Sequence, residues 1–313
     1  MIVTVTPNPS VDRTLAIRDL RRGAVLRCER NWHDASGKGV NVSLALLGNA
    51  HQTRAVLPAG GPDGARLPAM MEAEGLDYVS VPIRGEVRSN VSLVEPDGTV
   101  TKINEPGPEL SSDEVDALLR AALEAVNPGD WLAGCGSLAP GMPVDFYAEL
   151  VDGGHRRGVK VGVDTSGPPL ARVLPAHPDL VKPNAEELAD VTGMPVTSIG
   201  EAVAAAGRVR ELGARAVLTS LGADGALLVE ATRVIHGEAV VDKLESAVGA
   251  GDALFAGFLA AGGAGVEALA AALGWAAAAL RQPGTRMPTA AEVSRGVVTI
   301  HDVVDRNRRL RGD

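Results

Sequence analysis

A glycine-rich segment that precedes a single carboxylate has the clearest chemical potential in this sequence. In SAVGAGDALFAGF (246–258), Gly249, Ala250 and Gly251 come directly before Asp252 and a helical run. Small residues allow the backbone to approach a ligand, and the unpaired N–H groups at a helix start suit an anion. Asp252 could then accept the proton of an attacking hydroxyl during phosphoryl transfer. A glycine-rich turn with Asp252 as an ordinary helix N-cap is the alternative.

A second glycine-flanked segment, ASGKGVNVSLALLG (35–48), could bind a sugar. Gly37 permits close approach, Lys38 offers positive charge, and Asn41 can hydrogen-bond sugar hydroxyls from the first turn of a helix. The spacing is not that of a P-loop, and no G-x-G-x-x-G run follows the first strand, which disfavours a dinucleotide-binding Rossmann enzyme. A plain strand-to-helix turn is the alternative.

Two further segments could approach a nucleotide. In VKPNAEEL (181–188), Asn184 and Glu187 match a capping box, and the same side chains could instead hold a magnesium ion through water. In TSLGADGALL (219–228), Ser220 and Gly222 are small enough to approach phosphate or adenine in a turn between two strands. Each of these signals is weak when taken alone.

The elements that must position these segments follow from an alternation of β-rich and helical stretches. Strands are expected at 2–6, 54–58, 78–82, 131–136, 159–165, 180–183 and 216–222, and helices at 39–48, 62–74, 113–126, 143–157, 185–192 and 198–212. Ser111 with Glu114 forms a capping-box pattern, and Pro143 suits a first helical turn. The alternation predicts an α/β fold with a mainly parallel central sheet and helices on both faces, which binds ligands at the carboxyl ends of its strands.

Two stretches break this alternation. Residues 11–27 and 84–105 have strand-like patterns without a crossover helix, and 89–104 reads as a hairpin with Asp97-Gly98 at its turn. Paired together they would form a small sheet, either an edge extension or a lid over a phosphoryl-transfer site. We therefore assign residues 1–10, 28–83 and 106–313 to a large α/β nucleotide-binding domain, and residues 11–27 and 84–105 to a discontinuous β lid.

Composition limits the partners of the chain. Its 313 residues carry a formal net charge of −9, which argues against nucleic-acid and membrane-surface binding and requires local Arg and Lys for an anionic substrate. Two distant cysteines, Cys28 and Cys135, indicate a reducing compartment, and the six histidines show no metal-ligand spacing. The start of the chain reads as a strand, and the Ala/Gly-rich residues 259–280 read as a packed helix pair. We expect a cytoplasmic protein.

Four motifs in this order resemble the PfkB (ribokinase-like) family of sugar kinases over essentially the whole chain. The matching features are Asp12 near the first strand, SGKGVN, the Asn-x-x-Glu motif that begins at Asn184, and the Gly-Ala-Gly-Asp signature at 249–252. The resemblance implies that Asp252 is the catalytic base and that its neighbours form the anion hole. It also implies ATP and Mg²⁺ as cofactors.

Further segments resemble the phosphofructokinase/tagatose-6-phosphate kinase branch of that family, and most closely its members that act on fructose 1-phosphate. These segments are TPNPSVDRT, RSN (88–90), TKINEPGPEL (101–110), GSLAPGMPVDFYAEL (136–150) and VDTSG (163–167). The resemblance implies phosphorylation of fructose 1-phosphate on its C6 hydroxyl to give fructose 1,6-bisphosphate. Kinases of tagatose 6-phosphate or fructose 6-phosphate, and a non-catalytic sugar-phosphate sensor, stay open as alternatives.

The residue roles follow from the motifs and from the need to bind a phosphate. Arg88, with Arg27 and Lys102, supplies cations in the expected lid. We expect sugar-phosphate contacts from Asp12, Gly37, Lys38, Asn41, Arg88 and Lys102, nucleotide contacts from Lys182, Asn184, Ser220, Gly222 and Gly225, and a magnesium contact from Glu187. Ser36 stands where the family usually has glycine, and serine adopts a positive φ only at a cost. The resemblance also implies a homodimer formed through the lid, which would cover its exposed face.

Overall fold

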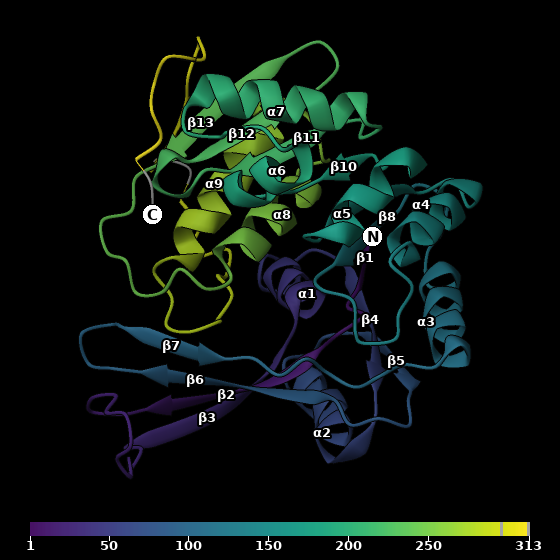
Figure 1. Ribbon diagram of the computed structural model, residues 1–313, viewed down its shortest axis with the longest axis vertical. Coiled ribbons are helices and arrows are strands. Elements are labelled where there is room, and N and C mark those ends of the chain that lie inside the picture. The colour runs from purple at the N-terminus through teal and green to yellow at the C-terminus, as the bar shows by residue number, and fades with distance from the viewer. Residues whose placement is uncertain (295–296, 312–313) are drawn as a thin grey trace.

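A ten-stranded sheet forms the centre of the fold in the computed structural model, which describes residues 1–294 and 297–311 (Figure 1). The strand order is β14-β13-β12-β11-β10-β9-β8-β1-β4-β5. The strands are β1 (Ile2–Val5), β4 (Thr53–Ala59), β5 (Tyr78–Pro82), β8 (Trp131–Cys135), β9 (Lys160–Asp164), β10 (Leu180–Val181), β11 (Val217–Ser220), β12 (Ala226–Val229), β13 (Val234–Ala239) and β14 (Val298–Ile300). From β11 to β5 every pairing is parallel, whereas β12, β13 and β14 pair antiparallel. The expected mainly parallel sheet is confirmed.

Helices cover both faces of this sheet. They are α1 (Lys38–Gly48), α2 (Gly61–Ala73), α3 (Ser112–Glu124), α4 (Phe146–Arg156), α5 (Pro168–Val173), α6 (Ala185–Thr192), α7 (Ile199–Glu211), α8 (Ala250–Ala260) and α9 (Gly265–Ala279), with 3₁₀ turns η1 (Leu174–Ala176) and η2 (Gly222–Asp224). Successive residues of a strand point to opposite faces, so Val217 belongs to the core that contains side chains of α3 to α7, while Leu218 belongs to the core that contains those of α1, α8 and α9. Both faces are apolar because both are buried.

The Ala/Gly-rich stretch 259–280 is part of a helix pair in the core, as expected. Helices α8 and α9 pack so closely that a Cβ on Gly257 would lie 2.9 Å from Trp275 Cγ. Phe255, Leu269 and Trp275 are buried with them. Within residues 1–294 and 297–311, the helices all fall short of the length and apolar character that a membrane crossing requires.

The small separate sheet is also present, with strand order β3-β2-β6-β7. It contains β2 (Ser10–Ala16), β3 (Arg30–Ser36), β6 (Arg88–Val94) and β7 (Val100–Ile103), and it projects below the main body in Figure 1. Strands β6 and β7 form the expected hairpin around Asp97 and Gly98, closed by a hydrogen bond from Glu95 N to Thr99 O. Strand β2 pairs with β6 in parallel, as the proposed joining of the two stretches requires.

Two local details differ from the expectations. Residues 30–36 form a strand of the small sheet, although the sequence assigns them to the large domain; the segment RNWHDAS lacks apolar alternation, and seven-residue pairing with β2 determines its conformation. Pro143 does not occupy the first turn of a helix, because α4 begins at Phe146 and the carbonyl of Pro143 accepts the Phe146 N–H in a preceding turn.

Candidate active site

The N-terminus of α8 presents N–H groups without an intrahelical acceptor at the carboxyl edge of the main sheet. Gly249 is the N-cap with φ 83°, and Ala250, Gly251 and Asp252 form the first turn. The first helical hydrogen bond runs from Ala253 N to Gly249 O at 2.9 Å, so the N–H groups of residues 250–252 have no acceptor within the helix. Asp252 is therefore not the N-cap, and the alternative that makes it an ordinary capping residue is wrong.

Asp252 lies in a setting that suits a general base. Asp252 is 6% exposed, and Asn41 Nδ2 from α1 donates a hydrogen bond of 2.7 Å to Asp252 Oδ2. Burial raises the pKa of Asp252 above the ordinary carboxyl value, while the nearby Lys38 ammonium acts in the opposite direction. A carboxylate with a raised pKa holds a proton more strongly, which is the property a proton acceptor needs at neutral pH.

Beside Asp252 lies a group that we call the edge cluster, formed by Lys38, Asp164 and Lys182. Lys38 Nζ is 3.1 Å from Asp164 Oδ1, and Lys182 Nζ is 3.2 Å from Asp164 Oδ2. Burial alone would raise the pKa of the fully buried Asp164, but the two lysines outweigh it and the pKa is lowered. Asp164 in turn raises the pKa of Lys38 and keeps that side chain protonated. Two ammonium groups therefore share one carboxylate.

The edge cluster faces the glycine-rich turn. A Cβ on Gly251 would lie only 3.5 Å from Lys182 Nζ. An anion bound at the first turn of α8 would thus meet helix N–H groups and an ammonium group together. Asp164 is absent from the sequence-predicted site, although its place at the end of β9 gave a usable signal, since ligands of parallel sheets bind at the carboxyl ends of strands.

The residues expected to contact a nucleotide lie on two adjacent loops. Asn184 caps α6 by accepting from Glu187 N at 2.7 Å, and Glu187 Oε2 accepts from Asn184 N at 2.9 Å, so the capping box exists. Asn184 also forms a β-bridge with Ser220 at the end of β11. Gly222 begins η2, the turn that follows. Gly225 is left-handed at φ 79° and a Cβ there would collide with Gly237 O, so its glycine serves the packing against β13.

The small sheet contributes a second polar group. Asp12 Oδ1 accepts hydrogen bonds from Ser10 Oγ at 2.7 Å and from Asn90 Nδ2 at 3.0 Å. Strand register places Asp12 opposite Asn90 and Ser92 opposite Lys102, so all four share one face with Arg88. Val11, which points to the other face, packs with Leu67 of α2. Asn90 was not predicted as a site residue, although it belongs to the quoted RSN motif.

Arg88 is half-buried between the two sheets. Its Nη2 donates to Asn8 O at 2.9 Å and its Nη1 donates to Glu105 O at 3.0 Å. Its Nε is buried without a hydrogen-bond partner in the described part of the chain. Burial lowers the pKa of Arg88, and the carboxylates of Asp12 and Glu105 act against that effect. The guanidinium is thus fixed by two backbone carbonyls, and its buried Nε–H has no acceptor among the described residues.

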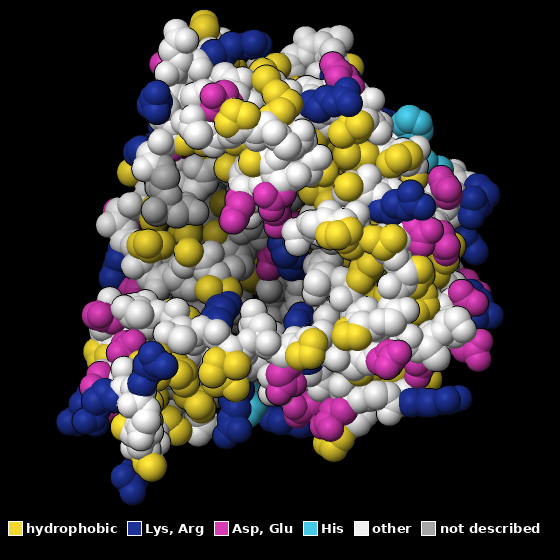
Figure 2. Space-filling model, in the orientation of Figure 1, with side chains coloured by type: hydrophobic (Ala, Val, Ile, Leu, Met, Phe, Trp, Pro, Cys, Tyr) yellow, Lys and Arg dark blue, Asp and Glu magenta, His cyan; other side chains and the backbone are white. Residues whose placement is uncertain are grey.

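The start of α1 connects the two polar groups. Gly37 has φ 120°, and a Cβ there would lie 2.6 Å from Thr6 Cγ2, so this position requires glycine. Ser36 is a buried strand residue paired with Ser10, and its φ is not positive. The cost expected for serine at that position therefore does not arise. Figure 2 shows that the molecule is hollowed between the small sheet and the large body, with acidic and basic side chains in the hollow.

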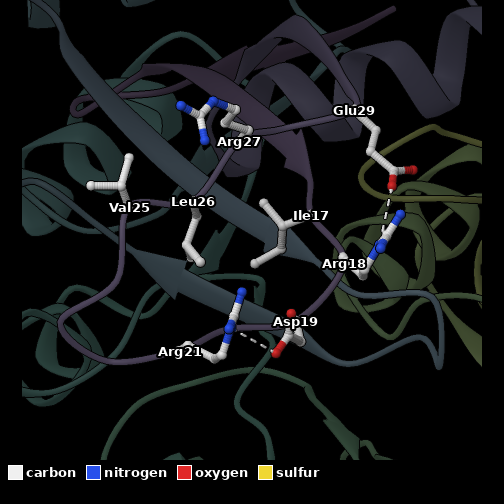
Figure 3. Close-up of a pocket in the computed structure, with 8 residues that line it drawn as sticks. All are labelled: Ile17, Arg18, Asp19, Arg21, Val25, Leu26, Arg27 and Glu29. Carbon is white, nitrogen blue, oxygen red and sulfur yellow. Dashed lines mark ion pairs between the residues drawn. The ribbon is translucent and has the colours of Figure 1, made fainter.

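Two predicted cations lie apart from this group. Lys102 is exposed on β7, the edge strand of the small sheet, although it faces the same side as Asp12. Arg27 lies in the loop between β2 and β3, where it lines a pocket with Ile17, Arg18 and Leu26 at the outer end of the sheet (Figure 3). The carboxyl edge of the main sheet thus brings together Lys38, Asn41, Lys182 and Asp252, and the small sheet holds Asp12 and Arg88 separately.

Comparisons with known proteins identify the family of the chain. The family model described as pfkB family carbohydrate kinase matches residues 6–291. A 1-phosphofructokinase of Rhodobacter capsulatus is 35% identical over 268 residues, which cover 85% of each chain. The ATP-dependent 6-phosphofructokinase isozyme 2 of Escherichia coli is 31% identical, with 81% of this chain and 82% of that protein covered. The crystal structure of phosphofructokinase-2 from Escherichia coli in complex with substrates and products superposes with a TM-score of 0.87 and 29% identity, covering 93% of this chain and 96% of that one.

Proposed function

Because the chain belongs to the pfkB family of carbohydrate kinases, we propose that it transfers the γ-phosphoryl group of ATP to fructose 1-phosphate. The observation that carries the chemistry is the buried Asp252 carboxylate beside free helix N–H groups and the edge cluster. Support for the substrate comes from the 35% identity to the 1-phosphofructokinase of Rhodobacter capsulatus. The product of this reaction is fructose 1,6-bisphosphate.

In the proposed reaction Asp252 accepts the proton of the C6 hydroxyl as that oxygen attacks the γ-phosphorus. The O–H bond breaks, a new O–P bond forms, and the bond from the γ-phosphorus to the bridging oxygen breaks to release ADP. The N–H groups of Gly249, Ala250 and Gly251 bind the transferring phosphoryl oxygens. Lys38 and Lys182 compensate the negative charge of the phosphates, and Asn41 orients the Asp252 carboxylate through its 2.7 Å hydrogen bond.

The nucleotide is proposed to lie along the loops that carry Lys182, Asn184, Ser220, Gly222 and Gly225. Glu187 fits a magnesium ion held through water, because only its Oε2 takes part in the capping box and Oε1 has no hydrogen bond among the described residues. A bound Mg²⁺ would supply charge neutralisation for the phosphate oxygens.

The small sheet is proposed to hold the phosphosugar. Asp12, whose Oδ2 has no protein donor in the described ranges, would accept hydrogen bonds from sugar hydroxyls. Arg88, which is half-buried, would bind the substrate phosphate through its positive charge, with Lys102 near the outer edge. Gly37 would let the sugar approach the backbone at the start of α1.

A phosphosugar with its phosphate on C6 is the second candidate substrate. The 6-phosphofructokinase isozyme 2 of Escherichia coli is 31% identical to this chain and covers a similar share of it. Fructose 6-phosphate or tagatose 6-phosphate would then present the C1 hydroxyl to Asp252, and the sugar would lie in the opposite direction. The base and the anion hole keep their roles in both cases.

An acceptor comparison tests the proposal. ADP release is measured with Mg-ATP and equal concentrations of fructose 1-phosphate, fructose 6-phosphate, tagatose 6-phosphate and free fructose. A higher kcat/KM for fructose 1-phosphate is expected. A preference for a 6-phosphate would keep the kinase chemistry and replace the substrate, whereas ATP binding without turnover on any acceptor would contradict the proposed function.

We further propose a homodimer formed through the small sheet. Val25 is 84% exposed and Leu20 41% exposed in the loop between β2 and β3, and Ile103 is 57% exposed on the edge strand β7. Pairing with a second copy would bury these apolar side chains and the open strand edge. Sedimentation of the wild type and of Ile103→Lys distinguishes a dimer from a monomer. The unpaired Cys28 and Cys135 agree with the proposed cytoplasmic location.

A further inference from the structure

A group of charged side chains joins the C-terminal segment to the loop between β11 and β12. Asp224, the last residue of η2, is only 1% exposed. Its Oδ1 accepts hydrogen bonds from Arg308 Nη2 at 2.6 Å and from Arg311 Nε at 2.9 Å. Its Oδ2 accepts from the Arg311 backbone N–H at 2.7 Å. Arg308 and Arg311, which are distant from Asp224 in the sequence, therefore fix the turn η2.

Glu238 on β13 completes what we call the C-terminal cluster, formed by Asp224, Glu238, Arg308 and Arg311. Arg308 donates to both oxygens of Glu238, at 2.6 and 2.7 Å, and Arg311 Nη2 donates to Glu238 Oε1 at 2.9 Å. All four carboxylate oxygens of the cluster are thus bonded to a guanidinium or a backbone N–H. Two negative charges face two positive charges.

Two histidines hydrogen-bond to this cluster, but they do not make it a metal site. His236 Nε2 donates to Asp224 O at 2.8 Å, and His301 Nε2 donates to Glu238 Oε2 at 2.7 Å. The ligand atoms of His236, Glu238 and His301 lie within 4.8 Å of one another, a separation that a metal ion could bridge. Both Glu238 oxygens are already bonded to guanidinium groups, which would also repel a divalent cation. The group is therefore a closed ion-pair cluster.

The backbone around the two arginines is fixed on another element. Leu310 N donates to Thr197 O at 2.9 Å, and the carbonyls of Arg308 and Arg306 accept from Ile199 and Gly200 at 2.9 Å each. The C-terminal segment is thus anchored at the start of α7 while its side chains reach η2. This segment follows residue 291, where the match to the family model ends.

We propose that Arg308 and Arg311 are positioning residues for nucleotide binding. Their bonds fix Asp224, and Arg311 Nη2 also binds Ala223 O at 2.7 Å, so the C-terminal segment holds two of the three residues of η2. The third residue, Gly222, belongs to the proposed ATP site. If the turn is held in its binding conformation, every molecule can bind the nucleotide. If the turn is released, only a fraction of the molecules has the binding conformation at any time, and the apparent affinity falls in proportion to that fraction. The inference rests on the nucleotide assignment made under the proposed function.

The experiment compares Arg308→Gln with Arg306→Gln. Arg306 lies exposed in the same segment, and its side chain takes no part in the C-terminal cluster, so the control makes the same charge change. Arg308→Gln is expected to raise the KM for Mg-ATP about three- to tenfold and to change the KM for the phosphosugar less than twofold. Arg308→Lys keeps the charge but not the fork of donors, and an intermediate effect is expected. Calorimetric titration with ADP gives the nucleotide affinity without turnover.

Each outcome decides the inference. A weaker ADP affinity in Arg308→Gln, with the control unchanged, supports it even when no tested acceptor is phosphorylated, a result that would contradict the proposed function alone. A lower melting temperature with unchanged KM values for both substrates would show a purely structural role and overturn it. Absence of ADP binding to the wild type would also overturn it, together with the nucleotide assignment. Should Arg308→Gln not fold, the comparison of Arg308→Lys with the wild type decides in the same way.

Discussion

The edge cluster and the C-terminal cluster both lie near the proposed nucleotide site, and they differ in how completely their charges are paired. The edge cluster has two lysines and one carboxylate, with Lys38 Nζ 3.1 Å from Asp164 Oδ1 and Lys182 Nζ 3.2 Å from Asp164 Oδ2. The C-terminal cluster has two guanidiniums and two carboxylates, and each carboxylate oxygen accepts at least one hydrogen bond. One cluster carries an excess positive charge and the other is neutral.

This difference suggests different roles for the two clusters: the edge cluster suits ligand binding, and the C-terminal cluster suits stabilisation of a fixed conformation. Lysine is a compact point charge that can turn toward a phosphate, whereas arginine with two donors per carboxylate fixes a geometry. The two ammonium groups of the edge cluster can therefore turn toward an anionic ligand. In the C-terminal cluster every carboxylate oxygen is already bonded, so we propose that this cluster affects nucleotide binding only by fixing the position of η2.

The largest effect is expected for Asp252→Asn, which removes the proposed base while leaving the edge cluster intact. Turnover should fall by roughly 10²- to 10⁴-fold, because an amide cannot accept the proton of the attacking hydroxyl. Nucleotide affinity should change little, since the cations and helix N–H groups remain. Steady-state kinetics and ADP titration measure the two quantities. Full turnover in this variant would remove Asp252 from the base role.

Asp164→Asn tests the edge cluster through stability. It leaves Lys182, which is 3% exposed, without its carboxylate, and removal of one partner of a buried pair costs roughly 3–5 kcal/mol in free energy of unfolding. Because the pKa of Asp164 is lowered in the folded state, the stabilisation is present above the unfolded carboxyl pKa of about 4 and is lost as pH falls below it. Denaturant unfolding at neutral and acidic pH measures this difference. Asp302→Asn, at an exposed position, is the control.

Much of the fold could be predicted because its signals are local. The run LVKPNAEEL contains a buried strand, a capping pair and a helical period, and α6 begins and ends at the expected residues. Strand β3 could not be predicted in this way, because RNWHDAS has neither apolar alternation nor a turn signal and takes its strand form from pairing with β2. The strand conformation of this segment is therefore determined by its pairing with β2 and not by its local β-propensity.

The candidate site could be predicted where a short motif determines the local backbone conformation. The glycines at 249 and 251 indicated the start of α8, and two residues of the expected anion hole, Ala250 and Gly251, carry N–H groups without an acceptor in that helix. Asp164 and Arg308 were missed for a different reason. Their partners, Lys38 for one and Glu238 for the other, are distant in the sequence, and an ion pair between distant residues leaves no spacing to read.

Arg88 differs from Arg308 in its bonding, because its Nε has no acceptor among the described residues, whereas Arg308 binds two carboxylates. Arg88→Gln is expected to raise the KM for the phosphosugar about 10- to 100-fold, the loss of one charge-assisted hydrogen bond, and to leave the KM for ATP within twofold. Arg13→Gln, exposed on the adjacent strand β2, is the matched control. An equal rise of both KM values would indicate a folding defect, because Arg88 also binds two backbone carbonyls.

The smallest effect concerns Asn41, which donates to the base from the same helix that carries Lys38. Its hydrogen bond lowers the pKa of Asp252, against the larger and opposite effect of burial. Without that donor the pKa rises further, so in Asn41→Ala the acidic limb of kcat against pH should move about one unit toward neutral pH. Activity then falls at a higher pH than in the wild type, because only the deprotonated carboxylate can act. Asn49→Ala, at the other end of α1, should leave the limb in place, and an unmoved limb in Asn41→Ala would assign it to another group.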